Sequence, residues 1–513
     1  MRLSTLLVAL SLACAPARAQ DAPKRGARLS LPALAAELDP AGGRIVDAKG
    51  REVLLRGVNV NALAEYWQYG SFPTTFPFEP ADADRIAGIG WNAVRLLVSW
   101  SRVEPSPGEY DESYLKQVAR VVRLLAKHNV YTIIDFHQDA WGPALAARPG
   151  EACTAPAAPA FGWDGAPAWA TLDGGAPRCF TLFREVNPAV QAAFAAFFSN
   201  APGPGGMGIR TRYVRMLHHV AWRFATQKAI AGYDVMNEPN AFGAEQVAAL
   251  GQLYADAIAE MRSGEAAGDG FPHLVFFEPS ITWSDFASGT PPSFAHDGNI
   301  VFAPHIYRGG LTAGPIPRED FERARADAAA FGGAPVLVGE WGSDPRRADD
   351  PTDTYFERHQ AYQDEFRFSA TLWTWRESCG DPHKAGDVRA GREPYVWGEF
   401  HVDCATNAVA GIRQSLVEAL TRGRVRAAPG RLASTSYDDE TGVLTATGTA
   451  APRRSQLVAY WPARLFGTPA VESSGLVRVA TRPAWGGVYV IARAAGGDWS
   501  LTVAPEAPST SFR

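Results

Sequence analysis

Two glutamates that each follow an apolar run are the residues best placed to do chemistry in this chain. Glu238 ends the run in AGYDVMNEPN, and Glu340 ends the run in APVLVGEWGS. Each run is typical of a fully buried strand, and turn residues follow at once. In a parallel α/β barrel the carboxyl ends of the strands converge on one face, where substrates bind. Two acids on that face are the pair that hydrolysis of a glycosidic bond requires.

The two glutamates invite different roles. A retaining hydrolase holds its two carboxyl groups about 5–5.5 Å apart, which leaves no room for an interposed water. We assign Glu340 as the nucleophile and Glu238 as the acid/base, whose pKa must be raised by burial and by a nearby negative charge. A single glutamate at a strand end can instead pair with an arginine, but two of them favour catalysis.

Other polar residues lie inside the apolar runs. Asp135, His137 and Asp139 alternate in IIDFHQDAW, so all three face the same side of one strand. His305 and Tyr307 in APHIY have the same spacing. Because strands of a parallel barrel are normally apolar throughout, inward polar groups are costly unless they serve a site. We therefore expect these five residues to bind substrate.

Arginine and tryptophan complete the expected site. Arg95 in NAVRLLVSW is placed to form an ion pair with a buried carboxylate and to hold it ionised. Trp373 and Trp375 end the last apolar run, and an indole packs well against the apolar face of a sugar ring. The phase of the strand decides which of the two faces the site, and we favour Trp373.

These residues belong to a repeated pattern of eight apolar or β-rich runs with helical segments between them. The helical segment 112–129, for example, puts five aliphatic side chains on one stripe. Eightfold strand–helix alternation predicts an α/β fold, a (β/α)₈ barrel. An open doubly wound sheet would need a glycine-rich phosphate loop, which the sequence lacks. The runs are 53–60, 92–100, 130–139, 230–239, 274–280, 300–307, 335–342 and 370–378.

Two long connections follow strand ends, at 140–185 and 379–409. Substrate sites are commonly built from such loops, although the insertions can also be plain surface. Exposed tryptophans are costly, so we favour walls of a substrate cleft. The aromatic residues concerned are Trp141, Trp163, Trp169, Tyr395 and Trp397.

The chain of 513 residues is long enough for two domains. We predict a barrel domain with an N-terminal extension over residues 20–424. After a last helix at 412–423 the sequence becomes β-rich with frequent turns, which predicts an all-β sandwich domain at 425–513. This domain either binds carbohydrate or supports the barrel, and we favour the structural role.

The N-terminus indicates export. Arg2, an apolar stretch and Ala17-Arg18-Ala19 are typical of a signal peptide at residues 1–19, so we expect a secreted or periplasmic protein. Lipidation at Cys14 is the alternative. A net charge of −5 without a Lys or Arg run gives no support for nucleic-acid binding.

Four cysteines remain after the signal peptide: Cys153, Cys179, Cys379 and Cys404. An even number in an exported chain indicates disulfides, and three connectivities are open. We favour Cys153–Cys179 and Cys379–Cys404, because each pair would close one long loop. A zinc site is the competing interpretation, and the wide spacings count against it.

Taken together, these motifs resemble retaining glycoside hydrolases of family five, over residues 45–420. The residues that carry the resemblance are Arg95, His137, Asn237-Glu238-Pro239, His305, Tyr307, Glu340 and Trp373. The phrases DFHQDAW, NEPN, PHIY, GEWG and WTWRES look most like endoglycoceramidases. The resemblance implies that Asp139 and Asn237 bind sugar hydroxyls, that His305 and Tyr307 surround the nucleophile, and that no metal or organic cofactor is needed.

The same resemblance implies a glycolipid substrate, cleaved at the β-linkage between glycan and ceramide, by a monomer that makes transient lipid or micelle contact. An endoglucanase or mannanase, or a non-catalytic carbohydrate-binding protein, are the alternatives. The segment 61–70 has no lysine, unlike ganglioside-cleaving relatives. Residues that either form an apolar wall for the lipid or belong to the core are Trp67, Phe72, Phe76 and Phe78.

Overall fold

The structure is a computed structural model. It describes residues 26–294, 297–311, 315–348, 350 and 352–506. The predicted signal peptide at 1–19 and the alternative lipidation site at Cys14 lie outside these residues. Among the described helices, none has both the length and the apolar character needed to cross a membrane.

Parallel strands form the predicted barrel. In the described part of the chain, eight strands follow the order β11-β10-β9-β6-β5-β4-β13-β12. The amide of Phe302 donates to the carbonyl of Pro335 at 2.9 Å, which joins β11 to the start of β12 and closes the ring. The strands are β4 (Arg56–Val60), β5 (Ala93–Val98), β6 (Tyr131–Phe136), β9 (Ile230–Asp234), β10 (Leu274–Phe277), β11 (Ile300–Phe302), β12 (Leu337–Trp341) and β13 (Ser369–Leu372). Seven of them lie within the predicted runs and β13 begins one residue before its run, so the predicted fold class is confirmed.

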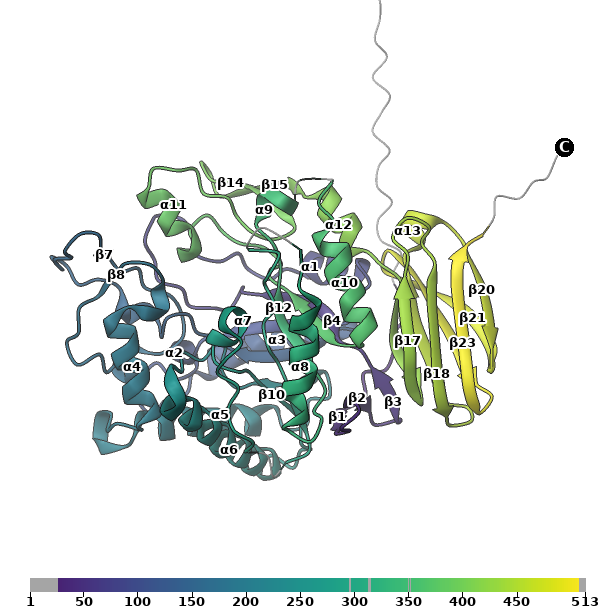
Figure 1. Cartoon of the computed structure of the whole chain (residues 1–513), viewed down its shortest axis with the longest axis horizontal. Coiled ribbons are helices and arrows are strands. Elements are labelled where there is room, and N and C mark those ends of the chain that lie inside the picture. The colour runs from purple at the N-terminus through teal and green to yellow at the C-terminus, as the bar shows by residue number, and fades with distance from the viewer. Residues whose placement is uncertain (1–25, 295–296, 312–314, 349, 351, 507–513) are drawn as a thin grey trace, which may run out of the picture.

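Helices cover the outside of the barrel (Figure 1). The helix predicted over 112–129 is α3, whose apolar stripe is buried and whose N-cap residue Asp111 accepts hydrogen bonds from two backbone amides. Because the stripe faces the strands, burial fixes the helix against the sheet. The longer helices are α1 (Pro80–Gly88), α3 (Glu112–Lys127), α4 (Pro188–Phe198), α5 (Ile209–Phe224), α6 (Gly243–Ala267), α8 (Arg318–Ala329), α10 (Tyr355–Phe366) and α12 (Gln414–Leu420).

Two antiparallel sheets form the C-terminal domain, as expected. One contains β17 (Arg431–Tyr437), β18 (Leu444–Ala451), β20 (Pro469–Ser474) and β23 (Gly497–Pro505). The other contains β16 (Arg424–Pro429), β19 (Gln456–Trp461), β21 (Leu476–Ala484) and β22 (Gly487–Ala494). Buried side chains of both sheets, including Trp461 and Trp499, meet in one core.

The N-terminal segment joins this second sheet. Strands β1 (Leu34–Glu37), β2 (Arg44–Asp47) and β3 (Arg51–Val53) extend it through the pairing of β3 with β16. In Figure 1 they lie in purple at the junction between the barrel and the yellow-green strands. The predicted domain boundary at 424/425 stays a prediction, but the sheet itself contains strands from both ends of the chain.

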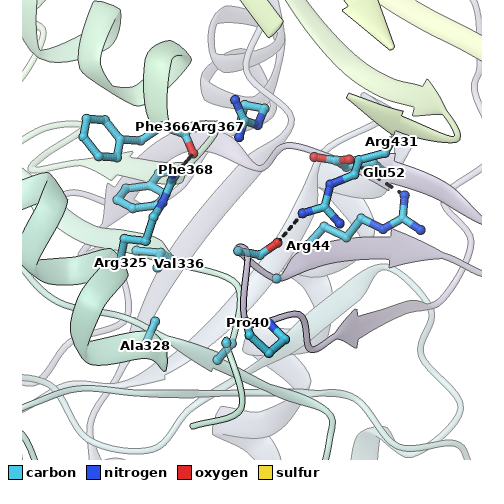
Figure 2. Close-up of a pocket in the computed structure, with 14 residues that line it drawn as sticks. Pro40, Arg44, Glu52, Arg325, Ala328, Val336, Phe366, Arg367, Phe368 and Arg431 are labelled. Atoms are coloured by element: carbon cyan, nitrogen blue, oxygen red, sulfur yellow. Dashed lines mark hydrogen bonds and ion pairs between the residues drawn. The ribbon is translucent and has the colours of Figure 1, made fainter. Parts of the chain in front are cut away.

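A pocket at this junction is lined by charged residues of four segments (Figure 2). Arg44 and Glu52 come from the N-terminal strands, Arg325 from α8, Arg367 from the end of α10 and Arg431 from β17. Arg431 forms an ion pair with Asp39 at 2.6 Å. None of the lining residues belongs to the predicted site.

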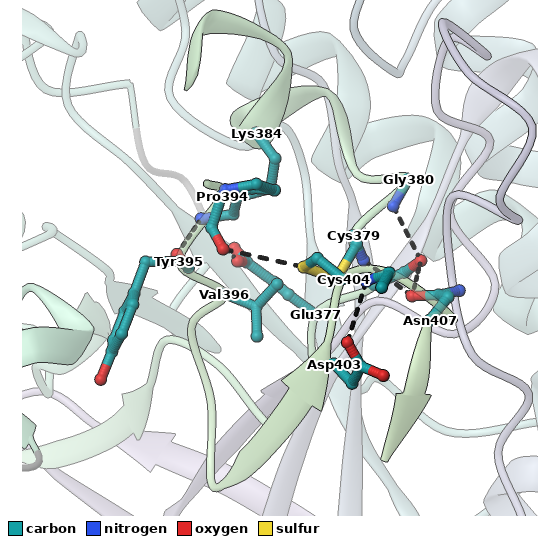
Figure 3. The surroundings of a disulfide bond; sticks show 12 residues. Glu377, Cys379, Gly380, Lys384, Pro394, Tyr395, Val396, Asp403, Cys404 and Asn407 are labelled. Atoms are coloured by element: carbon teal, nitrogen blue, oxygen red, sulfur yellow. Dashed lines mark hydrogen bonds and ion pairs between the residues drawn. A yellow bond between two sulfur atoms is a disulfide. The ribbon is translucent and has the colours of Figure 1, made fainter. Parts of the chain in front are cut away.

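Both predicted disulfides are present. Cys153 pairs with Cys179 and Cys379 with Cys404, which confirms the favoured connectivity and leaves these four thiols unavailable to zinc. Figure 3 shows the second disulfide beside Asn407, whose side-chain oxygen accepts a hydrogen bond from the Cys379 amide at 2.9 Å. Each disulfide closes one of the long loops that follow β6 and β13.

Candidate active site

Glu238 and Glu340 face each other at the carboxyl end of the barrel. Glu238 lies four residues beyond the end of β9, and Glu340 is the last residue but one of β12. One carboxylate oxygen of each and a ring nitrogen of His305 all lie within 4.8 Å of one another. His305 Nδ1 is 2.9 Å from Glu238 and 3.7 Å from Glu340. The separation leaves no room for a water between the carboxylates and fits the retaining geometry.

Two donors hold Glu340. Arg95 Nη1 donates to one carboxylate oxygen at 2.8 Å, and the Tyr307 hydroxyl donates to the other at 2.7 Å. The predicted ion pair between Arg95 and a buried carboxylate is therefore confirmed. Gly339 precedes Glu340, and a Cβ there would lie only 2.8 Å from the His305 ring, so the close approach of strand and imidazole needs glycine.

Arg95 is fully buried on β5 and contacts three further carboxylates. It pairs with Asp135 at 3.0 Å, with Asp234 at 2.9 Å and with Glu278 at 2.8 Å. It also donates to the side-chain oxygen of Asn237 at 3.0 Å. With Glu340 these are five partners, which lie on or just after the four strands β6, β9, β10 and β12 and fix the floor of the site around one permanent positive charge.

Asp135 on β6 and His137 and Asp139 just beyond it, the alternating residues of the prediction, lie in the same region. Asp135 accepts from His137 Nδ1 at 2.7 Å, and His137 Nε2 lies 3.9 Å from Asp139. Burial lowers the pKa of His137, but Asp135 and Asp164 outweigh it and raise that pKa to about 9. Trp373 stacks on the His137 ring at 5.4 Å between centroids. His137 is therefore a cationic imidazole that lies beside the indole face of Trp373.

Trp375 lies elsewhere. Its indole nitrogen donates to Asp82 on α1 at 3.1 Å, and its ring packs in the main core against Phe400. Both tryptophans follow the end of β13 at Leu372, so strand alternation does not place them, and the chain beyond the strand puts Trp373 beside His137 and Trp375 in the core. The structure thus places Trp373 beside the other predicted site residues and Trp375 away from them, and sugar binding by either tryptophan stays a prediction.

Electrostatic effects on the catalytic pair run through His305. Burial lowers the pKa of His305, but Glu278 and Glu340 outweigh it and raise that pKa well above its ordinary value. Burial raises the pKa of Glu238, yet the hydrogen bond with His305 outweighs it and brings that pKa below the ordinary value. Burial raises the pKa of Glu340 in spite of His305 and Arg95. In the free protein the proton thus lies on His305, and the expected raised pKa of Glu238 is not found.

A match to a protein-family model decides which family this chain belongs to. The model described as cellulase (glycosyl hydrolase family 5) matches residues 46–378, which is more than half of the chain. The chain belongs to glycosyl hydrolase family 5. The predicted resemblance, which spans residues 45–420, is confirmed over residues 46–378.

Several individual proteins are similar to this chain, and their descriptions name ceramide-linked glycolipid enzymes. The chain is 33% identical to a protein of known structure described as endogalactoceramidase, with a TM-score of 0.81 over 92% of this chain and 99% of that one. It is 27% identical to endoglycoceramidase I of Rhodococcus hoagii over 60% of this chain, and 25% identical to an endoglycoceramidase of Cyanea nozakii over 53%. These two matches span 62% and 56% of the relatives' own lengths.

Glu278 is a member of the family-5 site that sequence reasoning missed. It follows β10, accepts a hydrogen bond from the Glu238 amide at 2.8 Å and lies 3.1 Å from His305 Nε2. Its signal was present, because Glu278-Pro279 ends the run LVFFEPS as Glu238-Pro239 ends its own run. Two positions with the same strand-end pattern thus supply one catalytic carboxylate and one that positions it.

The long loops bring further charged groups. Arg184 donates to Asp139 at 2.6 Å and lies 3.9 Å from Glu238. His383, from the loop after β13, lies 3.4 Å from the second oxygen of Asp139. Burial lowers the pKa of His383, but Asp381 and Asp139 outweigh it and raise that pKa to about 10. Neither loop residue had a local sequence signal.

The loop aromatics divide between site and core. Trp163 contacts the His383 ring at 5.1 Å, and Trp397 contacts Tyr307 at 6.4 Å, as expected for a substrate site. Trp141 is buried in the main core, and Trp169 packs against Trp100 in the same cluster. Two of these four tryptophans thus lie beside predicted site residues, and their role as cleft walls stays a prediction.

The aromatic segment after β4 divides in the same way. Phe78 is in the main core and Phe76 packs under Arg376. Trp67 stacks with Tyr69 and its ring is tilted against that of Phe161, and Phe72 is half-buried. Phe78 is therefore excluded from any wall for a lipid.

Three groups in the described residues have donor atoms close enough to hold a metal ion. One is the catalytic set itself. Another joins Glu377, Asp381 and His383, where Lys384 already pairs with Glu377 at 2.8 Å. The third joins His137, Asp139 and Asp164. Each is buried among arginine, lysine or protonated histidine, which supply the charge that a cation would supply.

Proposed function

We propose that this family-5 protein is a retaining β-glycosidase that cleaves the bond between a sugar and ceramide in glycolipids. The approach of Glu238 and Glu340, with oxygens within 4.8 Å, carries the proposal. Relatives described as endoglycoceramidase and endogalactoceramidase support the ceramide aglycone. The two disulfides support export.

In the proposed reaction Glu340 attacks the anomeric carbon while Glu238 protonates the departing ceramide oxygen. The bond to ceramide breaks and a glycosyl–Glu340 ester forms. Water, deprotonated by Glu238, then attacks the same carbon, which releases the sugar with its configuration retained and frees Glu340.

The proton for the first step is stored on His305. We propose that it passes along the 2.9 Å hydrogen bond from His305 Nδ1 to Glu238 when substrate fills the site, which leaves a neutral imidazole and a protonated acid. Glu278, 3.1 Å from Nε2, keeps the ring oriented for this transfer. Arg95 and Tyr307 hold Glu340 ready for attack.

Exposed apolar side chains support contact with a lipid. Several lie in the connections that follow the carboxyl ends of barrel strands, where the substrate enters. Phe286 and Leu182 are each 72% exposed. The set is Leu182, Phe183, Val186, Phe286, Leu311 and Val388.

The test is product analysis. Purified protein is incubated with glucosylceramide, galactosylceramide and a soluble β-glucan, and sugar and ceramide are measured by mass spectrometry. Release of ceramide is expected, and Glu340→Gln should abolish it while substrate still binds. The description of the matching family model as cellulase favours polysaccharide as the second candidate, so hydrolysis of the glucan alone would replace the proposal.

A further inference from the structure

Glu278, the buried carboxylate that follows β10, is in contact with N–H groups of three other segments. One of its oxygens accepts a hydrogen bond from Arg95 Nη2 at 2.8 Å and lies 3.1 Å from His305 Nε2. The other oxygen accepts a hydrogen bond from the main-chain amide of Glu238 at 2.8 Å. The side chain is only 2% exposed, so water screens these contacts little. A single carboxylate thus touches the histidine, the acid/base and the central arginine of the site.

The contact with the Glu238 amide holds an unusual main-chain conformation. Glu238 has a φ of 39°, in the left-handed region that residues other than glycine rarely adopt. Such a conformation costs free energy and persists only where neighbouring groups hold it. Gln138 Nε2 donates to the Glu238 carbonyl at 3.0 Å, so the amide and the carbonyl of this residue are both held. The position of Glu278 relative to the acid/base is therefore fixed.

His305 lies between two carboxylates, one at each ring nitrogen. Nδ1 is 2.9 Å from Glu238, and Nε2 is 3.1 Å from Glu278. In the part of the chain that the structure describes, Nε2 has no aligned hydrogen-bond acceptor, so its contact with Glu278 is an attraction between charges. A lone pair on Nε2 would face a negative oxygen, whereas an N–H bond there is attracted to it. The carboxylate therefore favours a hydrogen on Nε2.

The hydrogen on Nδ1 is then the one that can move. Its nearest acceptor is Glu238, whereas Glu340 lies 3.7 Å away and already accepts hydrogen bonds from Arg95 and Tyr307. When the Nδ1–H bond breaks, its electron pair stays on the nitrogen and the proton forms an O–H bond on Glu238. The ring that remains is neutral and carries its hydrogen on Nε2.

We infer that the charge of Glu278 keeps this hydrogen on His305 Nε2, so that only the Nδ1 proton passes to Glu238. Glu278 is thus a positioning residue that acts through His305. The inference rests on the proposed function, in which Glu238 protonates the leaving group. Balancing the charge of Arg95 does not by itself require Glu278, because three other carboxylates lie within 3.0 Å of that guanidinium.

The test is Glu278→Gln, which keeps the size of the side chain and an oxygen for Arg95 but removes the charge. The kcat/KM is measured on the 4-nitrophenyl and phenyl β-glycosides of the sugar that the wild type cleaves best, and on the corresponding glycosylceramide. Phenol and ceramide need a proton to leave, whereas 4-nitrophenol needs little. We therefore expect the variant to lose at least about tenfold more on the phenyl glycoside and the glycosylceramide. Equal losses on all three substrates would overturn the inference.

Tyr254→Phe is the matched control. Tyr254 Oη donates to the main-chain carbonyl of Glu278 at 2.7 Å and accepts from its amide at 3.2 Å. The variant thus disturbs the placement of the same residue and leaves its charge in place, so it should lower the three rates alike. A loss confined to the poor leaving groups in Tyr254→Phe would assign the effect to placement and overturn the role of the charge.

Nitrogen-15 NMR of histidine-labelled protein observes the ring directly, with His305→Gln to assign its signals. We expect hydrogen on both ring nitrogens in the free wild type. In Glu278→Gln we expect a neutral ring with its hydrogen on Nδ1, because the new amide can donate to Nε2. A wild-type Nε2 without hydrogen would overturn the inference even where the variant does not fold. Cleavage of the aryl glycosides without release of ceramide would instead contradict the proposed function, and the two aryl glycosides would still decide the inference.

Discussion

Arg95 organises the charges at the centre of the barrel. A guanidinium remains charged at any working pH, and it pairs here with four carboxylates. Burial lowers the pKa of Arg95, but Asp135 and Asp234 outweigh it and raise that pKa well above its ordinary value. Glu340 on β12 is therefore held by a group whose charge does not change when substrate binds.

Glu238→Ala tests the acid/base role at this scale. Ceramide is a poor leaving group that needs a proton, whereas 4-nitrophenol does not, so the variant should lose about 10²–10⁴-fold on glycosylceramide and much less on the aryl glycoside. Steady-state rates on the two substrates decide the point. Equal losses on both would count against the role of Glu238.

Asp164 gives a prediction about stability and pH. Its side chain is fully buried, and neither carboxylate oxygen has a hydrogen-bond partner. Burial raises the pKa of Asp164 to about 8, whereas in the unfolded chain a carboxyl titrates near about 3.9. Between these values the folded protein holds a proton that the unfolded chain has released, so this group makes stability fall as pH rises towards 8.

Asp164→Asn removes this dependence. The Tm of the variant minus that of the wild type should therefore rise between pH 5 and pH 9, as thermal unfolding followed by circular dichroism would measure. The exposed Asp498→Asn serves as the control. A difference that stays constant over this pH range would refute the prediction.

At the scale of elements, the two loops that the disulfides close supply charged residues to the site, among them Arg184 and His383. Their separations of 26 and 25 residues are long enough for each disulfide to restrict the unfolded chain appreciably. The second also anchors the segment that carries Asp381 and His383. The Cys379–Cys404 disulfide therefore affects both the position of this loop and the stability of the protein.

Replacing both Cys379 and Cys404 by serine should lower the free energy of unfolding by about 3 kcal/mol. Denaturant titration with and without reductant measures the loss. The reductant should destabilise the wild type and have a smaller effect on the variant, which retains only Cys153–Cys179. A variant as stable as the wild type would mean that the surrounding hydrogen bonds hold the loop by themselves.

Strand and helix positions were largely predictable. The eight runs became barrel strands because continuous apolar sequence is stable only where both faces of a strand are buried. The stripe on α3 was buried for the related reason that a helix covers the sheet with one face. The positions of Trp373 and Trp375 were not predictable, because both follow the end of β13 and the alternation of the strand does not extend to them.

At the scale of the whole molecule, both ends of the chain build one sheet. Strand β3 pairs with β16, and a buried cluster joins residues at the bottom of the barrel, such as Tyr131, to Tyr460 and Tyr489 of the C-terminal domain. Burial of this cluster ties the stability of each domain to the other.

We therefore expect the two domains to unfold together. Differential scanning calorimetry of the full chain should show a single transition, since separation of the domains would break the shared sheet and expose the cluster. Two resolved transitions would show instead that the barrel and the sandwich are stable independently.

The sequence alone predicted the barrel, the meeting of Glu238 and Glu340 at its carboxyl end, the buried ion pair of Arg95 and the paired cysteines, because each has a local signal in apolar runs, strand ends or cysteine count. Only the tertiary structure decided which charged groups surround the glutamates. Glu278, Arg184 and His383 lie far apart in sequence and meet through loop closure and the ring of strands. Their effect on His305 and Glu238 depends on distances of a few ångströms, and those are set by packing across the whole barrel.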